Sequence, residues 1–437
     1  MRVLVIGSGA REHALVARLS ADPGVEVVCC APGNPGIARQ TRTVPLDVAD
    51  VDAAAALAAR ERIELTVVGP EVPLSKGIAD RFARDGRLLF GPTAAAARLE
   101  TSKAFAKAFM ARHGVATASF RVCGSAADAS AQVASGAFGF PIVLKADGLA
   151  AGKGVVIAGD RAAADAAIAA AMRDRVFGSA GDRLVVEEHL TGPEVSFFVV
   201  SDGRRAVPIG SAQDHKRIFD DDQGPNTGGM GAFAPSPLVP MSGGGLESRV
   251  MRDIVEPVIA GMAAEGNPFH GFLYVGLMLT ADGPKVIEFN VRLGDPEAQV
   301  ILPLIDEPLA PMLSAAAAGS LARSSVRIGG DKLTGVVLAS RRYPASSSSG
   351  QVIDGIDAAA AIPGVTVYHA GTGMRAGKVV TAGGRVLTVV GRGGDFSESI
   401  ARAYAGVMQI SFDGMQFRRD IGRKALRNSD NGMQNSE

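Results

Sequence analysis

Three polar side chains recur at alternate positions near residue 290, in an order that suits a metal ion beside a phosphate chain. They are Glu288, Asn290 and Arg292. The residues that alternate with them are apolar: Ile287, Phe289 and Val291. Because side chains alternate across a β-strand, we expect the apolar set to enter a core and the polar set to face a ligand. An edge strand with a polar outer face would give the same alternation.

A hairpin is predicted to hold these side chains in place. The segment 272–280 is apolar enough for a strand, and the Ala-Asp-Gly-Pro sequence at 281–284 has the composition of a tight turn. The strand with Glu288 follows directly. Carboxylate and amide oxygens suit a hard divalent cation, and a guanidinium suits phosphate.

Composition bounds the class of protein. With 437 residues, the chain is long enough for about three domains. A formal net charge of zero gives no general attraction to nucleic acid. No run reaches the roughly 18 apolar residues of a membrane span, and the N-terminus lacks the layout of a signal peptide. Three cysteines, at 29, 30 and 123, have no metal-ligand spacing and suit a reducing cytoplasm. We therefore expect a cytoplasmic protein without nucleic-acid or membrane partners.

The first hundred residues alternate apolar strands with helices. We expect strands at 3–6, 25–30, 65–68 and 88–90, and helices at 11–20, 53–61 and 78–85. This alternation indicates an α/β unit with a doubly wound parallel sheet.

The pattern changes after residue 101. A helix at 102–113 precedes strands expected at 142–145, 155–158, 183–188 and 194–200, and a further helix is expected at 242–266. The glycine-rich stretch 210–235 is predicted to be a long functional or mobile loop. A β-rich unit follows, with strands at 333–339, 364–369, 378–381 and 386–391 and a helix at 396–408.

A glycine turn follows the first predicted strand. Gly7, Gly9 and Glu12 stand where backbone N–H groups and a helix dipole bind anions. Glu12 replaces the third glycine of the dinucleotide fingerprint, and the second strand ends without an acid for a ribose. A nicotinamide cofactor is therefore not expected. The turn either binds a phosphate of another ligand or packs the helix tightly on the strand.

The loop 147–154 joins two predicted strands and contains three glycines. Its backbone amides and Lys153 could fold over phosphates, with Lys145 projecting from the strand end toward the same charge. No Gly-Lys-Ser/Thr element opens a helix here, so the loop is similar to a P-loop only in a loose sense. A solvated hairpin is the alternative.

Two further segments combine charged side chains. Glu187 and Glu188 end an apolar strand, where carboxylates could accept from ribose hydroxyls, although surface acids are common at strand ends. Asp214, His215 and Lys216 bring an acid, an imidazole and a cation together. That mixture suits a small zwitterionic or phosphorylated substrate, with Asp214 and His215 able to transfer protons. A solvated loop would have the same composition.

Together, these segments resemble the phosphoribosylamine–glycine ligase family, ATP-grasp enzymes of purine biosynthesis. The resemblance runs from Met1 to about Lys424. Its most specific pieces are 7–13, 69–74, 213–217 and 292–299. The resemblance implies a pre-ATP-grasp domain like that of biotin carboxylase at 1–100, an ATP-grasp domain at 101–325 with its small lobe at about 120–188, and a small β-rich domain at 326–424. We expect 425–437 to be a disordered tail.

The family's site residues fall on matching positions of this chain. The resemblance implies ATP contacts at Lys103, Lys145, Gly148, Gly152, Lys153, Gly154, Glu187, Glu188, Leu190 and Glu194. It implies Mg²⁺ or Mn²⁺ held by Glu288 and Asn290. Many related ATP-grasp enzymes carry an extra carboxylate on the preceding strand, where the hairpin register gives this chain Gly276. Implied substrate contacts are Gly9, Glu12, Pro70, Glu71, Asp214, His215, Lys216, Arg292, Gly294, Asp295 and Pro296, with catalytic roles for Lys145, Arg292 and Asp214.

The implied reaction joins glycine to 5-phosphoribosylamine at the expense of ATP, through glycyl phosphate. We expect a monomer whose partners are these small molecules, and a loop at 148–154 that closes over ATP. Two other interpretations remain open: an ATP-grasp ligase acting on a different acid or amine, and a nucleotide-binding regulator without turnover.

Overall fold

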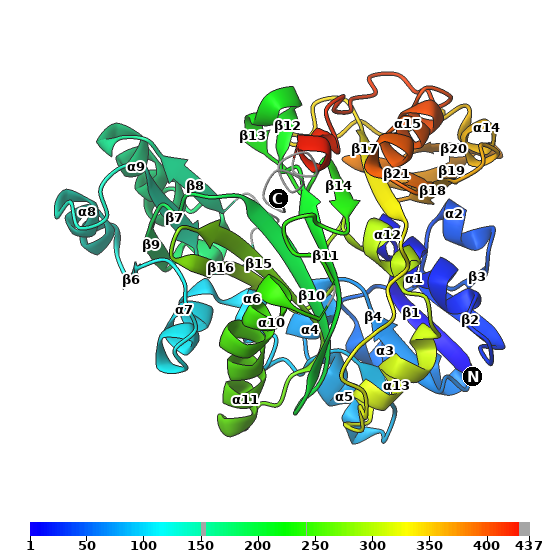
Figure 1. Cartoon of the computed structure of the whole chain (residues 1–437), viewed down its shortest axis with the longest axis horizontal. Helices are drawn as coiled ribbons and strands as arrows, with labels where there is room; N and C mark the ends of the chain where they lie inside the picture. Colours follow the sequence, from blue (N-terminus) through cyan, green and yellow to red (C-terminus); the bar gives the residue numbers. More distant parts are fainter. Residues whose placement is uncertain (150–153, 242, 428–437) are drawn as a thin grey trace, which may run out of the picture.

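The structure is a computed structural model, and it describes residues 1–149, 154–241 and 243–427. In Figure 1 the small lobe, in cyan and teal, stands to the left, the N-terminal part in blue lies at the lower right, and the C-terminal part in orange lies above it. Among the described residues, no helix is both long and apolar enough to cross a membrane.

The N-terminal sheet has five parallel strands in the order β3-β2-β1-β4-β5. They are β1 (Arg2–Gly7), β2 (Val27–Pro32), β3 (Arg42–Thr43), β4 (Leu65–Val68) and β5 (Leu89–Phe90). The helices between them are α1 (Ala10–Ser20), α2 (Pro35–Ala38), α3 (Val51–Arg60), α4 (Glu71–Ser75) and α5 (Ile78–Arg84). Val3 and Val5 enter one hydrophobic cluster, whereas Leu4 and Ile6 enter another. Both faces of the sheet are therefore covered, and the predicted doubly wound fold is confirmed.

The small lobe is a four-stranded antiparallel sheet in the order β6-β9-β7-β8. Its strands are β6 (Phe120–Cys123), β7 (Ile142–Ala146), β8 (Val155–Ala158) and β9 (Leu184–Glu188). Helices α8 (Ala126–Ala134) and α9 (Arg161–Ile168) pack on it through one hydrophobic cluster. The short α6 (Arg98–Thr101) and α7 (Lys103–Arg112) connect this lobe to the N-terminal domain.

The largest sheet has eight strands in the order β16-β15-β10-β11-β14-β17-β21-β18. Their bounds are β10 (Glu194–Asp202), β11 (Ala206–Asp214), β14 (Gly231–Ala234), β15 (His270–Thr280), β16 (Gly283–Asn290), β17 (Lys332–Ala339), β18 (Val365–His369) and β21 (Arg385–Gly393). A continuous helical run covers one face: α10 (Gly245–Val250), a π-helical turn (Met251–Val255) and α11 (Glu256–Ala264). The helix predicted over 242–266 is thereby confirmed within 245–264.

The prediction of a long loop over 210–235 is wrong for much of its length. That stretch holds the end of β11, the hairpin formed by β12 (Arg217–Phe219) and β13 (Gln223–Asn226), and β14. Its glycines mark close packing rather than a loop. A Cβ added at Gly231 would come within 2.6 Å of the Gly335 carbonyl oxygen on the neighbouring strand, and one at Gly210 within 2.8 Å of the Ile301 side chain.

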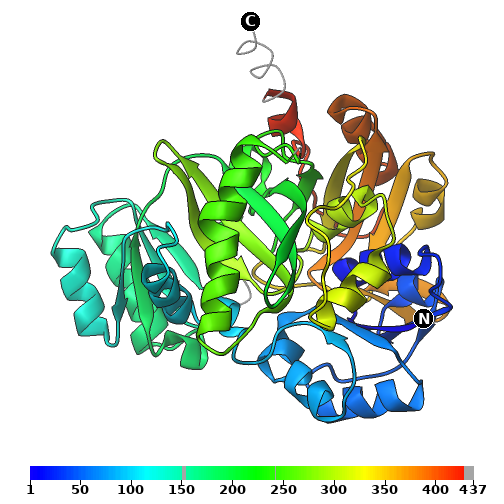
Figure 2. The same cartoon turned by 60° about the horizontal axis from the view of Figure 1, so that its bottom comes forward.

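The C-terminal β-rich part shares the large sheet with strands β10, β11, β14, β15 and β16. Strand β17 pairs with β14 on one side and with β21 on the other, and α15 (Phe396–Val407) packs on β17 and β21. The remaining elements are α12 (Ala298–Ile301), α13 (Leu309–Ala317), α14 (Ile356–Ala360), β19 (Thr372–Arg375) and β20 (Lys378–Thr381). Turned as in Figure 2, the orange C-terminal part lies beside the blue helix α1. There the His369 N–H donates to His13 Nδ1 at 2.8 Å.

The chain is ordered slightly beyond the predicted end of the last domain. Ala425 is buried in a small cluster with Phe233 and Phe396. Residues 425–427 therefore differ from the expectation of a tail that begins at 425, and the rest of that expected tail lies outside the described residues.

Candidate active site

A β-bulge shapes the strand that carries the predicted metal ligands. Gly276 on β15 pairs with Glu288, but Leu277 pairs with Val286, so Ile287 is the extra residue. Val286, Phe289 and Val291 enter the core, whereas Ile287 is only half-buried. The prediction that Ile287 faces the core is therefore wrong, because the bulge resets the alternation. From Glu288 onward the predicted alternation holds, and the predicted register with Gly276 is confirmed.

Cations surround the Glu288 carboxylate. Burial would raise the pKa of Glu288, but Lys216, Lys145 and Lys103, and then Arg292, hold that pKa below its ordinary value. Among the described residues, no hydrogen bond or ion pair engages this carboxylate directly. We call the set Lys103, Lys145, Lys216, Glu288 and Asn290 the lobe junction, because it draws on the small lobe and on the large sheet.

The donor set of the lobe junction fits a hard divalent cation that brings other ligands with it. Glu288 is held in its ionised form, and Asn290 lies two residues on, on the same face. Gly276, opposite Glu288, adds no side-chain oxygen. Within the described part of the chain, no group of three or more His, Cys, Asp or Glu side chains is placed to bind a metal. Two protein oxygens leave coordination positions for phosphate oxygens and water, which Mg²⁺-type ions accept.

Lys145 ties the small lobe to the bulge. Its Nζ donates to the Ile287 carbonyl oxygen at 3.0 Å and lies 2.9 Å from Glu187 Oε2. The same Glu187 oxygen lies 3.0 Å from Lys107 Nζ. All three side chains are buried. Both ammonium groups contact Glu187 Oε2, whereas Oε1 has no hydrogen-bond partner among the described residues, so the predicted ATP contact at Glu187 stays a prediction.

The start of the glycine-rich loop is fixed to α7. Lys103 Nζ donates to the Gly148 carbonyl oxygen at 3.1 Å. Asp147 Oδ1 accepts from the Ser102 hydroxyl at 2.9 Å and from the Ala104 N–H at 3.0 Å. Of the other predicted ATP contacts in this loop, Gly152 and Lys153 lie outside the described residues, whereas Gly154 accepts from the Ala146 N–H at 2.8 Å.

The remaining predicted ATP contacts lie on the far end of the small lobe and the start of β10. Glu188 Oε1 accepts from the Ser119 N–H at 2.8 Å, and Leu190 is half-buried. Glu194 is exposed and forms an ion pair of 3.1 Å with Lys216. The structure therefore brings Glu194, but not Glu188, into contact with a member of the lobe junction.

Asp214, His215 and Lys216 divide between the two faces of the chain. Burial raises the pKa of Asp214, with Lys216 opposing this and Glu194 adding to it. Burial would lower the pKa of Lys216, but Glu194 and Asp214 raise it well above its ordinary value. Asp214 and Lys216 therefore interact electrostatically with each other and with the other charged groups of the lobe junction.

His215 faces the opposite way, and its predicted role as a substrate contact stays a prediction. Its ring lies against Phe233, with ring centroids 5.9 Å apart, and only 1% of the residue is exposed. Burial, and then Lys424 and Arg418, lower the pKa of His215 to about 3. Neither ring nitrogen has a hydrogen-bond partner among the described residues. Asp214 ends β11, and His215 and Lys216 lie between β11 and β12, where the His215 ring enters the core while Asp214 and Lys216 lie beside Glu194.

Arg292 is clamped by two acids from the N-terminal region. Its guanidinium lies 3.3 Å from Glu71 Oε2 and 2.9 Å from Glu100 Oε1. Glu100 Oε2 also accepts from the Val291 N–H at 2.8 Å. The two predicted substrate contacts Pro70 and Glu71 lie at the start of α4, where Pro70 is the N-cap residue. Glu100 belongs to no recognisable sequence motif and was missed.

The glycine turn at the N-terminus is filled from within. The Gly9 N–H donates to Glu12 Oε2 at 2.5 Å, and Arg11 Nε donates to Glu12 Oε1 at 2.5 Å. A Cβ added at Gly7, Gly9 or Gly69 would come within 3.0 Å of the Glu12 side chain. The predicted substrate contacts at Gly9 and Glu12 stay predictions, although the Gly9 N–H at the helix start already has the Glu12 carboxylate as a partner.

The motif 294–297 meets the C-terminal part. Asp295 Oδ2 lies 3.2 Å from Arg385 Nη2, and Gln299 donates to Asp295 Oδ1 at 2.7 Å. Burial would raise the pKa of Asp295, but Arg385 and Arg11 hold it low. Pro296 packs against Gly229, where a Cβ would meet it at 2.5 Å. Arg385 stands ninety residues away in the sequence, so sequence reasoning had no signal for it.

Glu297 belongs to this motif but is not among the predicted site residues. Ser196 Oγ donates to its Oε1 at 3.3 Å and to the Tyr274 hydroxyl at 3.1 Å. Burial and the neighbouring Asp214 raise the pKa of Glu297 to about 7. A Cβ at Gly294 would come within 2.3 Å of its carboxylate, which accounts for the glycine there.

Comparison with known proteins identifies the domains. Three family profiles, described as the N, ATP-grasp (A) and C domains of phosphoribosylglycinamide synthetase, match residues 1–100, 101–298 and 333–424. The curated phosphoribosylamine–glycine ligase of Xylella fastidiosa strain Temecula1 is 49% identical over 98% of this chain and 98% of its own. That of Ralstonia nicotianae is also 49% identical, over 98% of this chain and 100% of its own.

Solved structures agree with these matches. The crystal structure of phosphoribosylamine–glycine ligase from Thermotoga maritima has a TM-score of 0.81 and 32% identity, covering 96% of this chain and 100% of that one. A biotin carboxylase from Campylobacter jejuni, in complex with β-γ-ATP, has a TM-score of 0.73 at 16% identity, covering 99% of this chain and 96% of that one. The second likeness concerns the fold alone. The chain belongs to the phosphoribosylamine–glycine ligase family of ATP-grasp enzymes.

Proposed function

We propose that the lobe junction is the place where this ligase activates glycine with ATP and joins it to 5-phosphoribosylamine. The observation that carries the assignment is the ionised Glu288 carboxylate, which faces Lys216, Lys145, Lys103 and Arg292 without a direct partner among the described residues. An acid and an excess of cations gathered at one point suit a polyphosphate and its metal ion.

The chemistry sets what the protein must do. A carboxylate is a poor electrophile in water, so glycine is first phosphorylated: its carboxylate oxygen attacks the γ-phosphorus of ATP, giving glycyl phosphate and ADP. The amine of 5-phosphoribosylamine then attacks the acyl carbon, the new C–N bond forms, inorganic phosphate leaves and the amine gives up a proton. Little covalent work falls on the protein, which positions the reactants and offsets developing charge.

Glu288 and Asn290 would hold the divalent ion, which we propose to be Mg²⁺ or Mn²⁺. When bound, the ion would neutralise phosphate charge. Lys103 and Lys145 would contribute the positive charge of the small lobe. We propose that the Lys145–Glu187–Lys107 group fixes the direction of the Lys145 ammonium, since the shared carboxylate and the Ile287 carbonyl leave it one position.

Glycine is a zwitterion, and the lobe junction offers both signs of charge beside the metal ligands. Asp214 would receive the ammonium group, and Lys216 and Arg292 would face carboxylate and phosphate oxygens. Asp295, Pro296 and Glu71 would serve as further substrate contacts. Glu297, with its pKa raised to about 7, is the side chain best suited to accept the proton that the attacking amine releases.

Substrate dependence tests this function. ADP release should require glycine and 5-phosphoribosylamine together, and bicarbonate or another amino acid should not replace glycine. ADP release with bicarbonate would instead favour a ligase that acts on another acid. Binding of ATP without any turnover would favour a regulator.

We also propose the domain boundaries 1–100, 101–325 and 326–424, a cytoplasmic location and a monomeric state. Sedimentation of the purified protein at micromolar concentration tests the last of these. A concentration-dependent mass of twice the chain would contradict it.

A further inference from the structure

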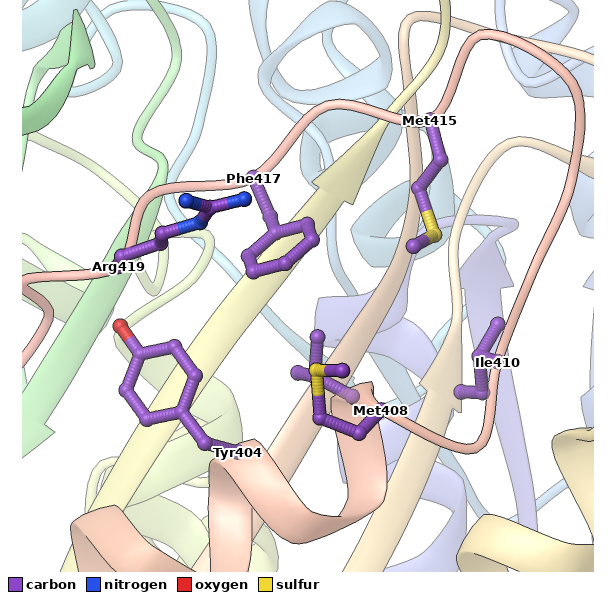
Figure 3. Close-up of a pocket in the computed structure, with 7 residues that line it drawn as sticks. Tyr404, Met408, Ile410, Met415, Phe417 and Arg419 are labelled. Atoms are coloured by element: carbon purple, nitrogen blue, oxygen red, sulfur yellow. The ribbon is translucent and has the colours of Figure 1, made fainter.

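The segment Gln416–Lys424, which we call the C-terminal strap, follows α15 and crosses back toward the large sheet. Figure 3 shows Phe417 and Arg419 on the strap near Tyr404 of α15, with Met415 and Met408 completing a pocket of about 490 Å³. The Tyr404 hydroxyl donates to the Arg418 carbonyl oxygen at 2.9 Å and accepts from the Ile421 N–H at 3.0 Å. The strap is thereby anchored to the helix at its middle.

Arg418 points away from that helix and is the largest side chain buried below 2% exposure. Its Nη1 lies 2.8 Å from Asp222 Oδ1, and its Nη2 lies 2.5 Å from Asp420 Oδ2. Lys424 adds an ion pair of 2.7 Å to Asp222. A buried guanidinium needs such partners, because an unpaired charge there would cost several kcal/mol.

The strap also pairs with the turn of the β12–β13 hairpin. Asp420 Oδ2 accepts from the Asp221 N–H at 3.0 Å, and Asp220 Oδ1 accepts from the Arg419 N–H at 2.7 Å. Asp221 and Asp222 have φ of 56° and 53°, a left-handed conformation that side chains other than glycine rarely adopt. The contacts of the strap hold the turn of this hairpin in that conformation.

The hairpin begins one residue after Lys216. Arg418 Nη1 donates to the Arg217 carbonyl oxygen at 3.1 Å. At the other end of the hairpin, the Thr227 N–H and hydroxyl donate to the Lys216 carbonyl oxygen at 2.7 and 2.8 Å. The peptide that carries the Lys216 side chain is therefore held from both sides of the hairpin.

We propose that Arg418 is a positioning residue for substrate binding. From the C-terminal part, it fixes the hairpin that orients Lys216 and Asp214 at the lobe junction. This inference rests on the proposed function, which assigns Asp214 and Lys216 to the substrate. It gives the C-terminal part a role in the ATP-grasp site although it contributes none of the five residues of the lobe junction.

If the contacts of Arg418 served stability alone, their loss would lower the melting temperature and leave the kinetic constants of the folded enzyme unchanged. A positioning role instead affects glycine and phosphoribosylamine selectively. The ATP side of the site is built on Lys103 and Lys145, neither of which touches the strap or the hairpin among the contacts described.

The test compares Arg418→Met with Arg419→Met in the full-length enzyme. Arg419 is adjacent and exposed, and its backbone N–H bond to Asp220 does not depend on its side chain. We expect Arg418→Met to raise the KM for glycine or phosphoribosylamine by about ten-fold or more, because a displacement of about 1 Å can cost up to a hundred-fold. The KM for ATP should stay within about two-fold, and Arg419→Met should behave as wild type. Equal changes in all three KM values, or no change, would overturn the proposal.

Two further measurements protect the test against misfolding and against failure of the proposed function. Asp222→Asn removes a partner whose side chain is 41% exposed, so it weakens the clamp without leaving a buried acid, and it should shift KM in the same direction. Hydrogen exchange of amides 214–231 requires no activity and should accelerate in Arg418→Met but not in Arg419→Met. Unchanged exchange in Arg418→Met would contradict the positioning role even if the ligase assay works. If the wild-type enzyme shows no glycine-dependent ADP release, the proposed function is wrong, and the exchange result alone then tests the role of the strap.

Discussion

The N-terminal glycine turn and the end of β16 each combine a glutamate with nearby glycines, but the two glutamates differ in their partners. Each places a glutamate where glycine leaves room for it: Glu12 beside Gly7, Gly9 and Gly69, and Glu288 opposite Gly276. Glu12 is bonded to the Gly9 N–H and to Arg11. Glu288 lacks a direct partner within the described ranges and is balanced by cations that surround it.

The difference shows how a structural acid is told from a functional one. A buried carboxylate is costly unless hydrogen bonds or charges compensate it. Glu12 is compensated locally, by the Gly9 N–H and by Arg11. Glu288 is compensated by side chains from both lobes, and its oxygens remain available. Glycine-rich sequence alone therefore indicates close packing, and the partners of the acid decide whether a ligand belongs there.

Replacing Glu288 should have the largest effect on activity. In Glu288→Gln, the metal loses its only charged protein ligand in the proposed site, so we expect kcat/KM to fall by at least about a hundred-fold. Circular dichroism and the melting temperature should stay near those of wild type, because this side chain has no internal partner to lose. Asp282→Asn, in the exposed turn of the same hairpin, is the matched control. Near-normal activity in Glu288→Gln would break the comparison.

Gly69→Ala should damage stability instead. Its Cβ would lie 2.0 Å from Glu12 Oε1, and relieving that overlap means moving a buried side chain that is bonded to the helix start. We expect a loss of about 1–3 kcal/mol in the free energy of unfolding, measured by urea denaturation. Gly124→Ala, where a Cβ meets no atom within 4 Å, should change it by less than about 0.5 kcal/mol. If both variants are equally stable, the turn is not filled as described.

Lys145→Met sharpens the comparison on the small-lobe side. The variant should bind ATP about ten-fold more weakly by calorimetry, since one charge-assisted contact of this kind contributes about 1.5 kcal/mol or more. Glu187 keeps Lys107 as a partner, so the lobe should remain folded. Lys285→Met, on the same strand as Glu288 but at its far end, should bind ATP as wild type does. Unchanged affinity in Lys145→Met would count against the phosphate assignment.

His215→Leu tests a predicted site residue that faces away from the site. Burial holds the pKa of His215 near 3, whereas the unfolded chain has its ordinary value of 6.5. The unfolded state therefore gains protons first as pH falls, and this histidine costs stability progressively below about pH 6.5. Between pH 7.5 and 5.5, wild type should lose about 1.4 kcal/mol more than the variant in urea unfolding.

Comparing the two proteins cancels the other titrating groups, notably Glu297, whose raised pKa acts in the opposite direction. The neighbours of the ring that keep their charges in both proteins are Lys424, Arg418, Asp420 and Asp222. The ligase activity of His215→Leu at pH 7.5 should stay within a few-fold of wild type. Parallel pH profiles of stability would show that the ring takes up protons in the folded state.

Much of the fold was predictable because its strands are short apolar runs between turn residues. Leu65–Val68 and Val155–Ala158 were predicted to the residue. Strands rich in glycine and alanine, such as β14, were not predicted, because their small residues read as loop until a neighbouring backbone is seen to approach them. The bulge at Ile287 was equally hidden, since one extra residue leaves no mark in an alternating pattern.

The candidate site follows the same rule: residues marked by a local pattern could be predicted, and residues that act across the fold could not. Glu288, Asn290 and Lys145 stand at the ends of recognisable strands, so local pattern singled them out, whereas Asp214 was placed in a predicted loop and was proposed from its charged neighbours and the family resemblance. Glu100 lies 192 residues before its partner Arg292, and Arg385 lies 90 residues after its partner Asp295, so only the folded chain brings these pairs together. Sequence reasoning grouped His215 with Asp214 and Lys216 because composition shows which residues are adjacent in the chain but not on which side each lies.

The unbroken run of strands from β16 to β18 bears on how this protein can be taken apart. A fragment that stopped at residue 325 would strip β17 from β14 and leave a row of unsatisfied backbone donors and acceptors on a flat, apolar strand. Such a fragment would tend to recruit strands from its own copies and precipitate. Anyone wishing to dissect this ligase should therefore cut elsewhere, and any insertion or fusion that splits those two strands can be expected to fail for the same reason.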